Sequence, residues 1–179
     1  MSRQYVLTIT AKDQTGLVEK IADAVVDAGG NWLESSLCHL AGKFAGVALV
    51  SVPPEQEEKL MQSLKALADK GIEVGATAYE TPASEPTEEL LMVKIVANDR
   101  PGIVQELTRL LASLNVNVET FDSGCESAAM YSQPVFEASV VVQLPANLTQ
   151  ESLANHLETL SDDLMVEIHD LLEDEEAEA

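Results

Sequence analysis

Residues 93–104 read VKIVANDRPGIV and residues 7–18 read LTITAKDQTGLV, so a related stretch occurs twice in the chain, 86 positions apart. The two copies share an isoleucine, an alanine, an aspartate, a glycine and a valine at matching places. The same offset of 86 carries Asn31 onto Asn117. Self-similarity at a fixed offset is typical of tandem units, so we expect two copies of one small fold.

Each copy begins with a strand, a turn and a helix. Apolar residues alternate before the turn, which indicates a strand with one buried face. After the turn they recur every three to four positions, which predicts an amphipathic helix. The apolar set is Leu17, Val18, Ile21, Ala24, Val25 and Ala28, repeated as Ile103, Val104, Leu107, Leu110, Leu111 and Leu114. In the second copy Pro101 stands where a first-turn proline is expected.

Two strands, a second helix and a last strand complete each copy. The predicted strands span residues 31–40, 44–52 and 72–78, and then 117–125, 135–144 and 164–168. The second helix spans residues 55–69 in the first copy and follows a capping Thr149 in the second. The order β-α-β-β-α-β, twice over, predicts an α+β protein of two tandem ferredoxin-like units, each with helices on one face of a four-stranded antiparallel sheet.

Composition sets the predicted domain boundaries. A Pro, Ser and Glu stretch without periodicity separates the copies, and a block of like charges ends the chain. We predict a first domain at residues 1–80, a linker at 81–88, a second domain at 89–172 and an acidic tail at 173–179. The connection between the middle strands is longer in the second copy, and there Met130 and Tyr131 are candidate contacts for a partner protein.

Charge excludes some classes of partner. The 179 residues contain 31 Asp and Glu against 10 Lys and Arg, a formal net charge of −21. Residues 1–86 hold 12 acidic and 7 basic residues, whereas residues 87–179 hold 19 and 3. Such a chain is repelled by phosphate groups, so we expect no direct binding of nucleic acid or of an anionic membrane surface.

The sequence also lacks the patterns of catalysis. No nucleophile motif, phosphate-binding loop or catalytic triad occurs, and the histidines lack a third ligand with metal spacing. Cys38 and Cys125 are two isolated cysteines, as in a reduced, cytoplasmic protein, and neither a signal peptide nor a membrane span is expected. We therefore predict a protein that is not an enzyme and needs neither cofactor nor metal.

The repeated turn is the motif with chemical content. Gly16 and Gly102 lack a Cβ, so a ligand can approach, and the free N–H groups of the following helix suit a carboxylate. An aspartate before the glycine can accept from an ammonium group, and Asn31 or Asn117 can both donate and accept. The same residue types also have ordinary structural roles as helix caps, turn formers and helix ends, so both interpretations stay open.

The segment Asp99-Arg100-Pro101-Gly102-Ile103-Val104, between an apolar strand and a helix and followed later by Asn117, resembles the motif of ACT domains. Residues 13–18 with Asn31 are a looser version that lacks the arginine and the proline. ACT domains are small regulatory modules that often bind amino acids at interfaces between paired domains. The resemblance implies ligand contacts at Asp13, Gly16, Leu17 and Asn31, and at Asp99, Pro101, Gly102, Ile103 and Asn117, with Leu17 and Ile103 contributing backbone groups.

A chain of two such domains with this length and linker resembles the glycine cleavage system transcriptional repressor family. The resemblance implies a regulatory protein that senses an amino acid, with glycine favoured, and acts through a DNA-binding activator protein. Exposed edge strands and helix faces are natural pairing surfaces, so we also expect the units to pack together and the chain to be able to form a homodimer. The alternative is a protein–protein interaction module whose acidic surface binds a basic partner and which has no metabolite ligand.

Overall fold

The computed structural model describes residues 2–80, 89–126 and 134–171. The chain divides into two compact units, Met1–Ser84 and Glu85–Ala179. The predicted linker, the predicted acidic tail, Met130 and Tyr131 all lie outside the described residues. The predicted domain limits at residues 80, 89 and 172 therefore stay predictions.

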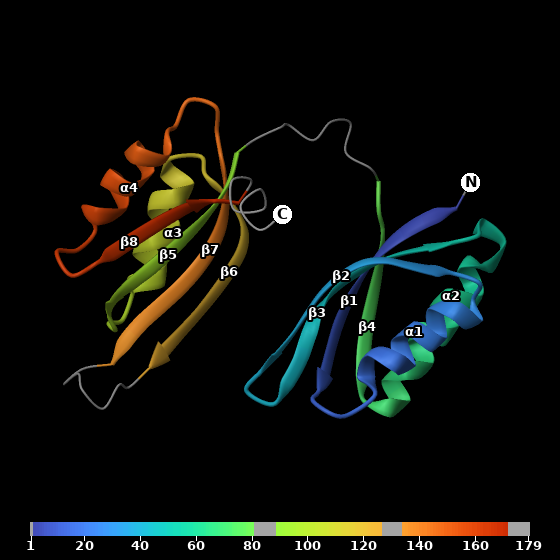
Figure 1. Cartoon of the computed structure of the whole chain (residues 1–179). Coiled ribbons are helices and arrows are strands. Elements are labelled where there is room, and N and C mark those ends of the chain that lie inside the picture. Colours follow the sequence, from blue (N-terminus) through green and yellow to red (C-terminus); the bar gives the residue numbers. More distant parts are fainter. Residues whose placement is uncertain (1, 81–88, 127–133, 172–179) are drawn as a thin grey trace, which may run out of the picture. The chain divides into compact units, whose positions relative to one another are not determined.

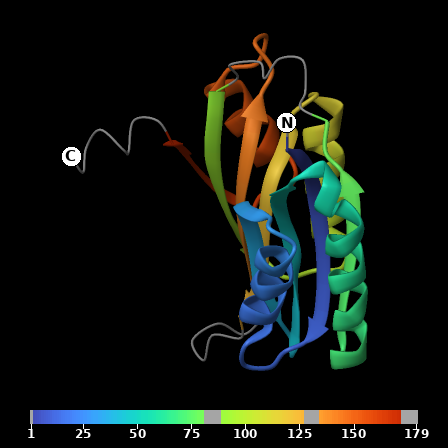
Figure 2. The same ribbon diagram turned by 90° about the vertical axis from the view of Figure 1, so that its right-hand side faces the viewer.

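The first unit has the order β-α-β-β-α-β (Figure 1). Its elements are β1 (Arg3–Lys12), α1 (Leu17–Asp27), β2 (Asn31–Leu40), β3 (Lys43–Val52), α2 (Glu57–Ala66) and β4 (Ile72–Ala78), with 3-10 turns at Pro54–Gln56 and Leu67–Lys70 on either side of α2. The strands form one antiparallel sheet in the order β2-β3-β1-β4. Both helices lie on the same face of this sheet (Figure 2).

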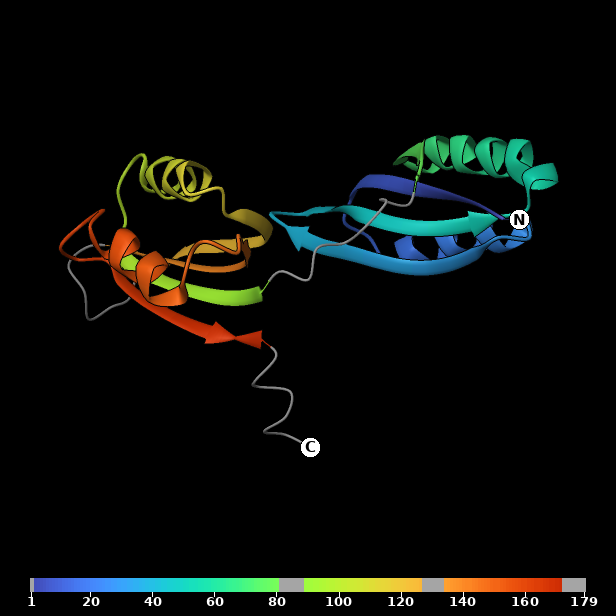
Figure 3. The same cartoon turned by 90° about the horizontal axis from the view of Figure 1, so that it is seen from above.

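The second unit repeats this arrangement. Its elements are β5 (Glu89–Asn98), α3 (Ile103–Ser113), β6 (Asn117–Glu126), β7 (Val135–Leu144), α4 (Gln150–Glu158) and β8 (Met165–Asp170). The sheet order β6-β7-β5-β8 matches that of the first unit, and the strands twist in the usual way (Figure 3). The predicted fold class, two tandem βαββαβ units of the α+β class, is confirmed.

Each unit has a core of its own between sheet and helices. Fully buried residues come from alternate strand positions and from the helix stripes, namely Leu7, Ile21 and Leu60 in one core and Leu91, Leu107 and Leu153 in the other. The helical pattern placed Val18 and Val104 on the core face, yet they are 43% and 41% exposed. They stand about 100° around the helix from Leu17 and Ile103, at the border of the stripe.

Local signals explain where the helices begin. Thr149 caps α4 as predicted, since its hydroxyl accepts a hydrogen bond from the backbone N of Ser152 at 3.2 Å. The expectation of a first-turn proline is wrong for Pro101. Gly102 has a left-handed conformation with φ 95°, so α3 begins only at Ile103 and Pro101 precedes the helix.

Both edge strands that follow the first helix contain a β-bulge. In β2, Trp32 pairs with Val50 and Glu34 pairs with Leu49, so Leu33 is an extra residue. In β6 the extra residue is Glu119, at the equivalent place. The bulge therefore belongs to the repeated unit.

Candidate functional site

The repeated turns have the same backbone geometry in both units. Gly16 has φ 79° and Gly102 has φ 95°, a left-handed conformation that costs glycine little and other residues more. Each glycine is the residue before the first helical turn, and no side chain caps either helix. The Ile103 N–H donates to the Arg100 carbonyl at 3.4 Å, and the other N–H groups of the first turns of α1 and α3 suit a small anion.

The two aspartates do not cap the helices, so the structural interpretation of them as caps is wrong. Their backbone N–H groups instead fasten each turn to the neighbouring hairpin. The Asp13 amide donates to the Gly42 carbonyl at 3.0 Å, and the Asp99 amide donates to the Pro134 carbonyl at 2.9 Å. Both side chains are exposed.

Each turn carboxylate faces the same position of the edge strand, β2 or β6, but the residue at that position differs in chemistry. In the first unit the Asp13 carboxylate lies 3.6 Å from Nε2 of His39. In the second unit the equivalent residue is Cys125, whose thiol has a pKa above its ordinary value because of partial burial and the adjacent Asp99 carboxylate. A raised pKa keeps this thiol protonated and argues against a nucleophilic role.

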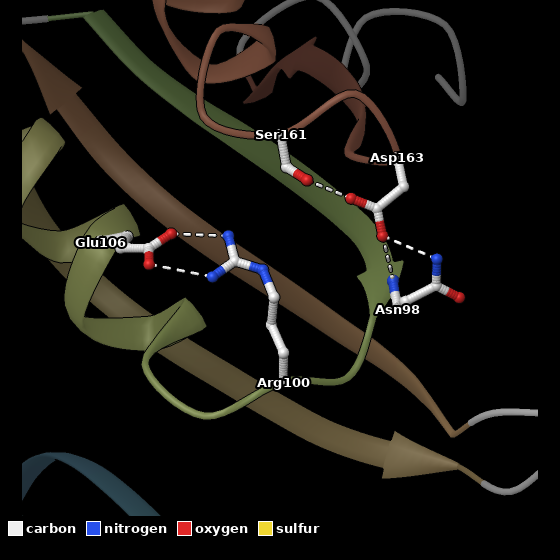
Figure 4. A network of polar contacts seen from close by, with 5 residues as sticks. All are labelled: Asn98, Arg100, Glu106, Ser161 and Asp163. Carbon is white, nitrogen blue, oxygen red and sulfur yellow. Dashed lines mark hydrogen bonds and ion pairs between the residues drawn. The ribbon is translucent and has the colours of Figure 1, made fainter.

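Arg100 distinguishes the second turn from the first. Its guanidinium donates two hydrogen bonds to the Glu106 carboxylate, at 2.9 and 2.6 Å (Figure 4). These hydrogen bonds from Arg100 hold the pKa of Glu106 below its ordinary value. The first unit has Gln14 and Lys20 at the same places, so it lacks this pair. The second turn is therefore cross-linked to α3, and the first is not.

Asp163 forms a second network beside that turn (Figure 4). Its carboxylate accepts from the Ser161 hydroxyl, and also from the backbone N and the side-chain Nδ2 of Asn98 at 3.0 and 2.7 Å. The bond from Ser161, followed by those from Asn98, lowers the pKa of Asp163 to about 2. The network ties the loop before β8 to the end of β5 and borders a hollow of about 220 Å³.

Sequence reasoning missed this network. Neither the repeat nor the turn motif points to Asp163. The available signal was a Ser-x-Asp sequence at residues 161–163 together with an asparagine at the end of an apolar strand. Only the pairing of β5 with β8 brings these two segments together.

The predicted asparagines lie at the far end of each unit from the turns. Asn31 pairs with Ser51, which in turn pairs with Gln4 near the start of β1. Asp13 follows Gln4 by nine residues, which corresponds to about 30 Å along a strand. The second unit has the same geometry, because Asn117 pairs with Gln143, and Gln143 with Leu90. The turn and the asparagine of one unit therefore do not form a single pocket.

The asparagines also differ in their surroundings. Nδ2 of Asn117 donates to Oε1 of Glu119 at 2.6 Å, and Glu119 is the bulge residue of β6. Leu33 is the bulge residue in β2, so Asn31 has no equivalent of this bond. Leu17 and Ile103 are 3% and 5% exposed, so any contact with a ligand would come from their backbone groups, as expected.

Two general features concern the described residues as a whole. Within residues 2–80, 89–126 and 134–171, no three His, Cys, Asp or Glu side chains are placed to hold a metal ion. No helix in these ranges is both long enough and apolar enough to cross a membrane.

The first unit matches a known family. Residues 3–76 match the family model of the ACT domain. No curated protein matches the sequence. One similar solved structure is an unknown protein from Galdieria sulphuraria, with 20% identity, 96% of this chain and 99% of that chain covered, and a TM-score of 0.83. Another is a "putative glycine cleavage system transcriptional repressor", with 14% identity, 95% and 99% coverage, and a TM-score of 0.69.

At these identities the two structures show a shared fold across almost the whole chain. Residues 3–76 thus match the ACT domain model, and the second unit has the same strand order and fold as the first.

Proposed function

We propose that this chain is a non-enzymatic regulatory protein that senses an amino acid, with glycine favoured, and modulates a partner protein. The observation that carries the proposal is the turn before α1 and α3. In both units it presents a left-handed glycine, uncapped helical N–H groups and an exposed aspartate. N–H groups suit the carboxylate of an amino acid, and an aspartate suits its ammonium group.

The proposed contacts are those implied by the resemblance to ACT domains. They are Asp13, Gly16, Leu17 and Asn31, and Asp99, Pro101, Gly102, Ile103 and Asn117. Because the turn and the asparagine of one unit lie about 30 Å apart along the strands, one amino acid cannot contact both within that unit.

Calorimetric titration of the full chain with glycine and the other common amino acids tests ligand sensing. Asp13→Ala combined with Asp99→Ala removes the carboxylate of both turns, so we expect saturable binding of the amino acid to disappear. Asp13→Ala alone removes the carboxylate of one turn only, so we expect half the stoichiometry of ligand binding. Asp23→Ala removes an exposed carboxylate from α1 away from the turn and is the matched control.

The alternative function, an acidic interaction module without a metabolite, is an outcome of the same experiment. Absence of binding heat with every amino acid, while capture of a basic protein partner persists, would favour it. Equal loss of binding in the Asp23→Ala control would mean that overall charge, and not the turn, governs the binding.

The proposed output is transcriptional regulation in the cytoplasm through a DNA-binding activator of the glycine cleavage system. The protein resembles a repressor of that system only in fold, and its charge of −21 disfavours direct contact with DNA. Co-purification from native lysate, with and without the amino acid found by calorimetry, tests this part. Eluates free of DNA-binding proteins under both conditions would contradict it.

A further inference from the structure

The face of the first sheet that points away from the helices has few charged side chains at its centre. Cross-strand pairing places twelve residues in three central rows of four, which we call the outer face of the first unit. The rows are Glu34, Leu49, Val6 and Thr77, then Ser36, Val47, Thr8 and Gly75, then Cys38, Ala45, Thr10 and Glu73. Within these rows only the two opposite corners, Glu34 and Glu73, carry a charge, and the next row toward the turn adds Lys12 and Lys43.

The equivalent face of the second unit is strongly charged. Its rows are Thr120, Val141, Met92 and His169, then Asp122, Ser139, Lys94 and Glu167, then Gly124, Glu137, Val96 and Met165. Three carboxylates and a lysine thus occupy positions that are uncharged in the first unit. The contrast is specific to this face, because the buried faces of both sheets are apolar.

The centre of the outer face of the first unit is apolar and hollowed. Val47 is 44% exposed, and a hollow of about 250 Å³ lies among Val6, Val47 and Leu49, with Tyr79 at its border. The remaining central side chains are small: Thr8, Thr10, Ser36, Cys38, Ala45 and Gly75. Small uncharged side chains allow a second sheet to approach to the usual spacing of about 10 Å.

We propose that this outer face is a self-association surface, against which the same face of a second copy of the chain packs. Two copies with a net charge of −21 each repel one another, so a stable contact needs a surface free of carboxylates at its centre. The outer face of the first unit meets that condition, and Glu34 and Glu73 stay at the rim. Packing against the equivalent face of the second unit would instead bury Asp122, Glu137 and Glu167 with Lys94 as the one cation among those rows.

The area of the outer face determines how strong a dimer we expect. Four strands about 4.8 Å apart, with three rows about 6.6 Å apart, give a face on the order of 400 Å² per copy. Two copies then bury on the order of 800 Å², at the low end for specific interfaces, so we expect a weak, concentration-dependent dimer.

Sedimentation velocity over a wide concentration range tests the proposal with a matched pair of variants. Val47→Glu adds a carboxylate to the centre of the outer face, and Ser139→Glu adds the same charge at the equivalent position of the second unit. We expect Val47→Glu to weaken the dimer roughly tenfold or more, and Ser139→Glu to change it by less than about twofold. Mixing Val47→Glu with Val47→Lys should restore association, because opposite charges then meet.

Thr8→Glu serves as a second variant if Val47→Glu unfolds, since the equivalent strand position holds the charged Lys94. Circular dichroism confirms folding of each variant. A wild-type chain that stays monomeric, a dimer insensitive to Val47→Glu, equal weakening by both glutamates, or no restoration on mixing would each overturn the proposal.

Discussion

The outer faces of the two sheets differ far more than their buried faces. The first unit carries small and apolar residues where the second carries Lys94, Asp122, Glu137 and Glu167. The fold constrains only alternate strand positions, because these fill the core, so the other positions can change after a duplication without loss of the fold. The difference teaches that one architecture presents two chemically distinct surfaces in a single chain.

The turns differ in the same manner. Their backbone conformation is shared, with glycines at φ 79° and 95°. The side chains around them are not, since Arg100, Glu106, Asn98 and Asp163 form networks in the second unit only. The turn geometry is therefore a property of the fold, and its cross-linking is a property of one copy.

Large-to-small substitutions in each core should distinguish the stabilities of the two units most clearly. Ile21→Ala and Leu107→Ala remove equivalent buried side chains from α1 and α3. We expect each to cost about 2–5 kcal/mol in the unit that contains it and little in the other, because the cores are separate clusters. Hydrogen exchange resolved by peptide measures this. Equal loss of protection in both units would show that the cores act as one cooperative body.

The shared turn conformation should give similar losses in both units. Gly16→Ala and Gly102→Ala each force a Cβ into the left-handed region, so we expect a cost of about 1–2 kcal/mol in the affected unit. Denaturant unfolding of each variant measures the loss. Gly124→Ala is the control, since no atom lies within 4 Å of its added Cβ. A loss as large in the control would contradict a specific effect of the turn.

The Asp163 network should make the second unit sensitive to acid. The folded-state pKa of Asp163, about 2, lies below the ordinary carboxyl value, so its stabilisation is present above about pH 4 and is lost as the pH falls toward about 2. Asp163→Asn should remove this part of the pH dependence. Unfolding of the second unit followed against pH provides the measurement. The first unit has Gly71 at this place, and an identical acid profile in both units would refute the assignment.

Arg100→Gln should give the smallest effect, because the ion pair is partly exposed. Glutamine is the equivalent residue in the first unit, so this change makes the second turn resemble the first. We expect the pKa of Glu106 to rise toward its ordinary value, as measured by carbon NMR of the carboxyl group. An unchanged pKa would mean that another group, and not Arg100, holds Glu106 in its ionised form.

Much of the fold follows from the sequence, because strand alternation and helical periodicity report burial directly. The repeat at an offset of 86 gives the number of units, and Thr149 marks a helix start. The Asn98–Asp163 network does not follow, because it depends on two segments 65 residues apart meeting across a sheet. The separation of Asp13 from Asn31 could have been predicted from the sequence. The predicted helix begins beside Asp13 and ends beside Asn31, so its length must separate the two residues.

The bulges at Leu33 and Glu119 each insert one extra residue into an edge strand, β2 or β6. Beyond the extra residue, every side chain of the strand moves to the opposite face. The bulge thereby brings His39 and Cys125 to the helix side, beside Asp13 and Asp99, and leaves Ser36 and Cys38 on the outer face. Deleting Leu33 would bring Ser36 and Cys38 to the helix side and move His39 to the outer face. One residue in an edge strand thus determines both which side chain lies beside the turn carboxylate and which side chains lie on the outer face.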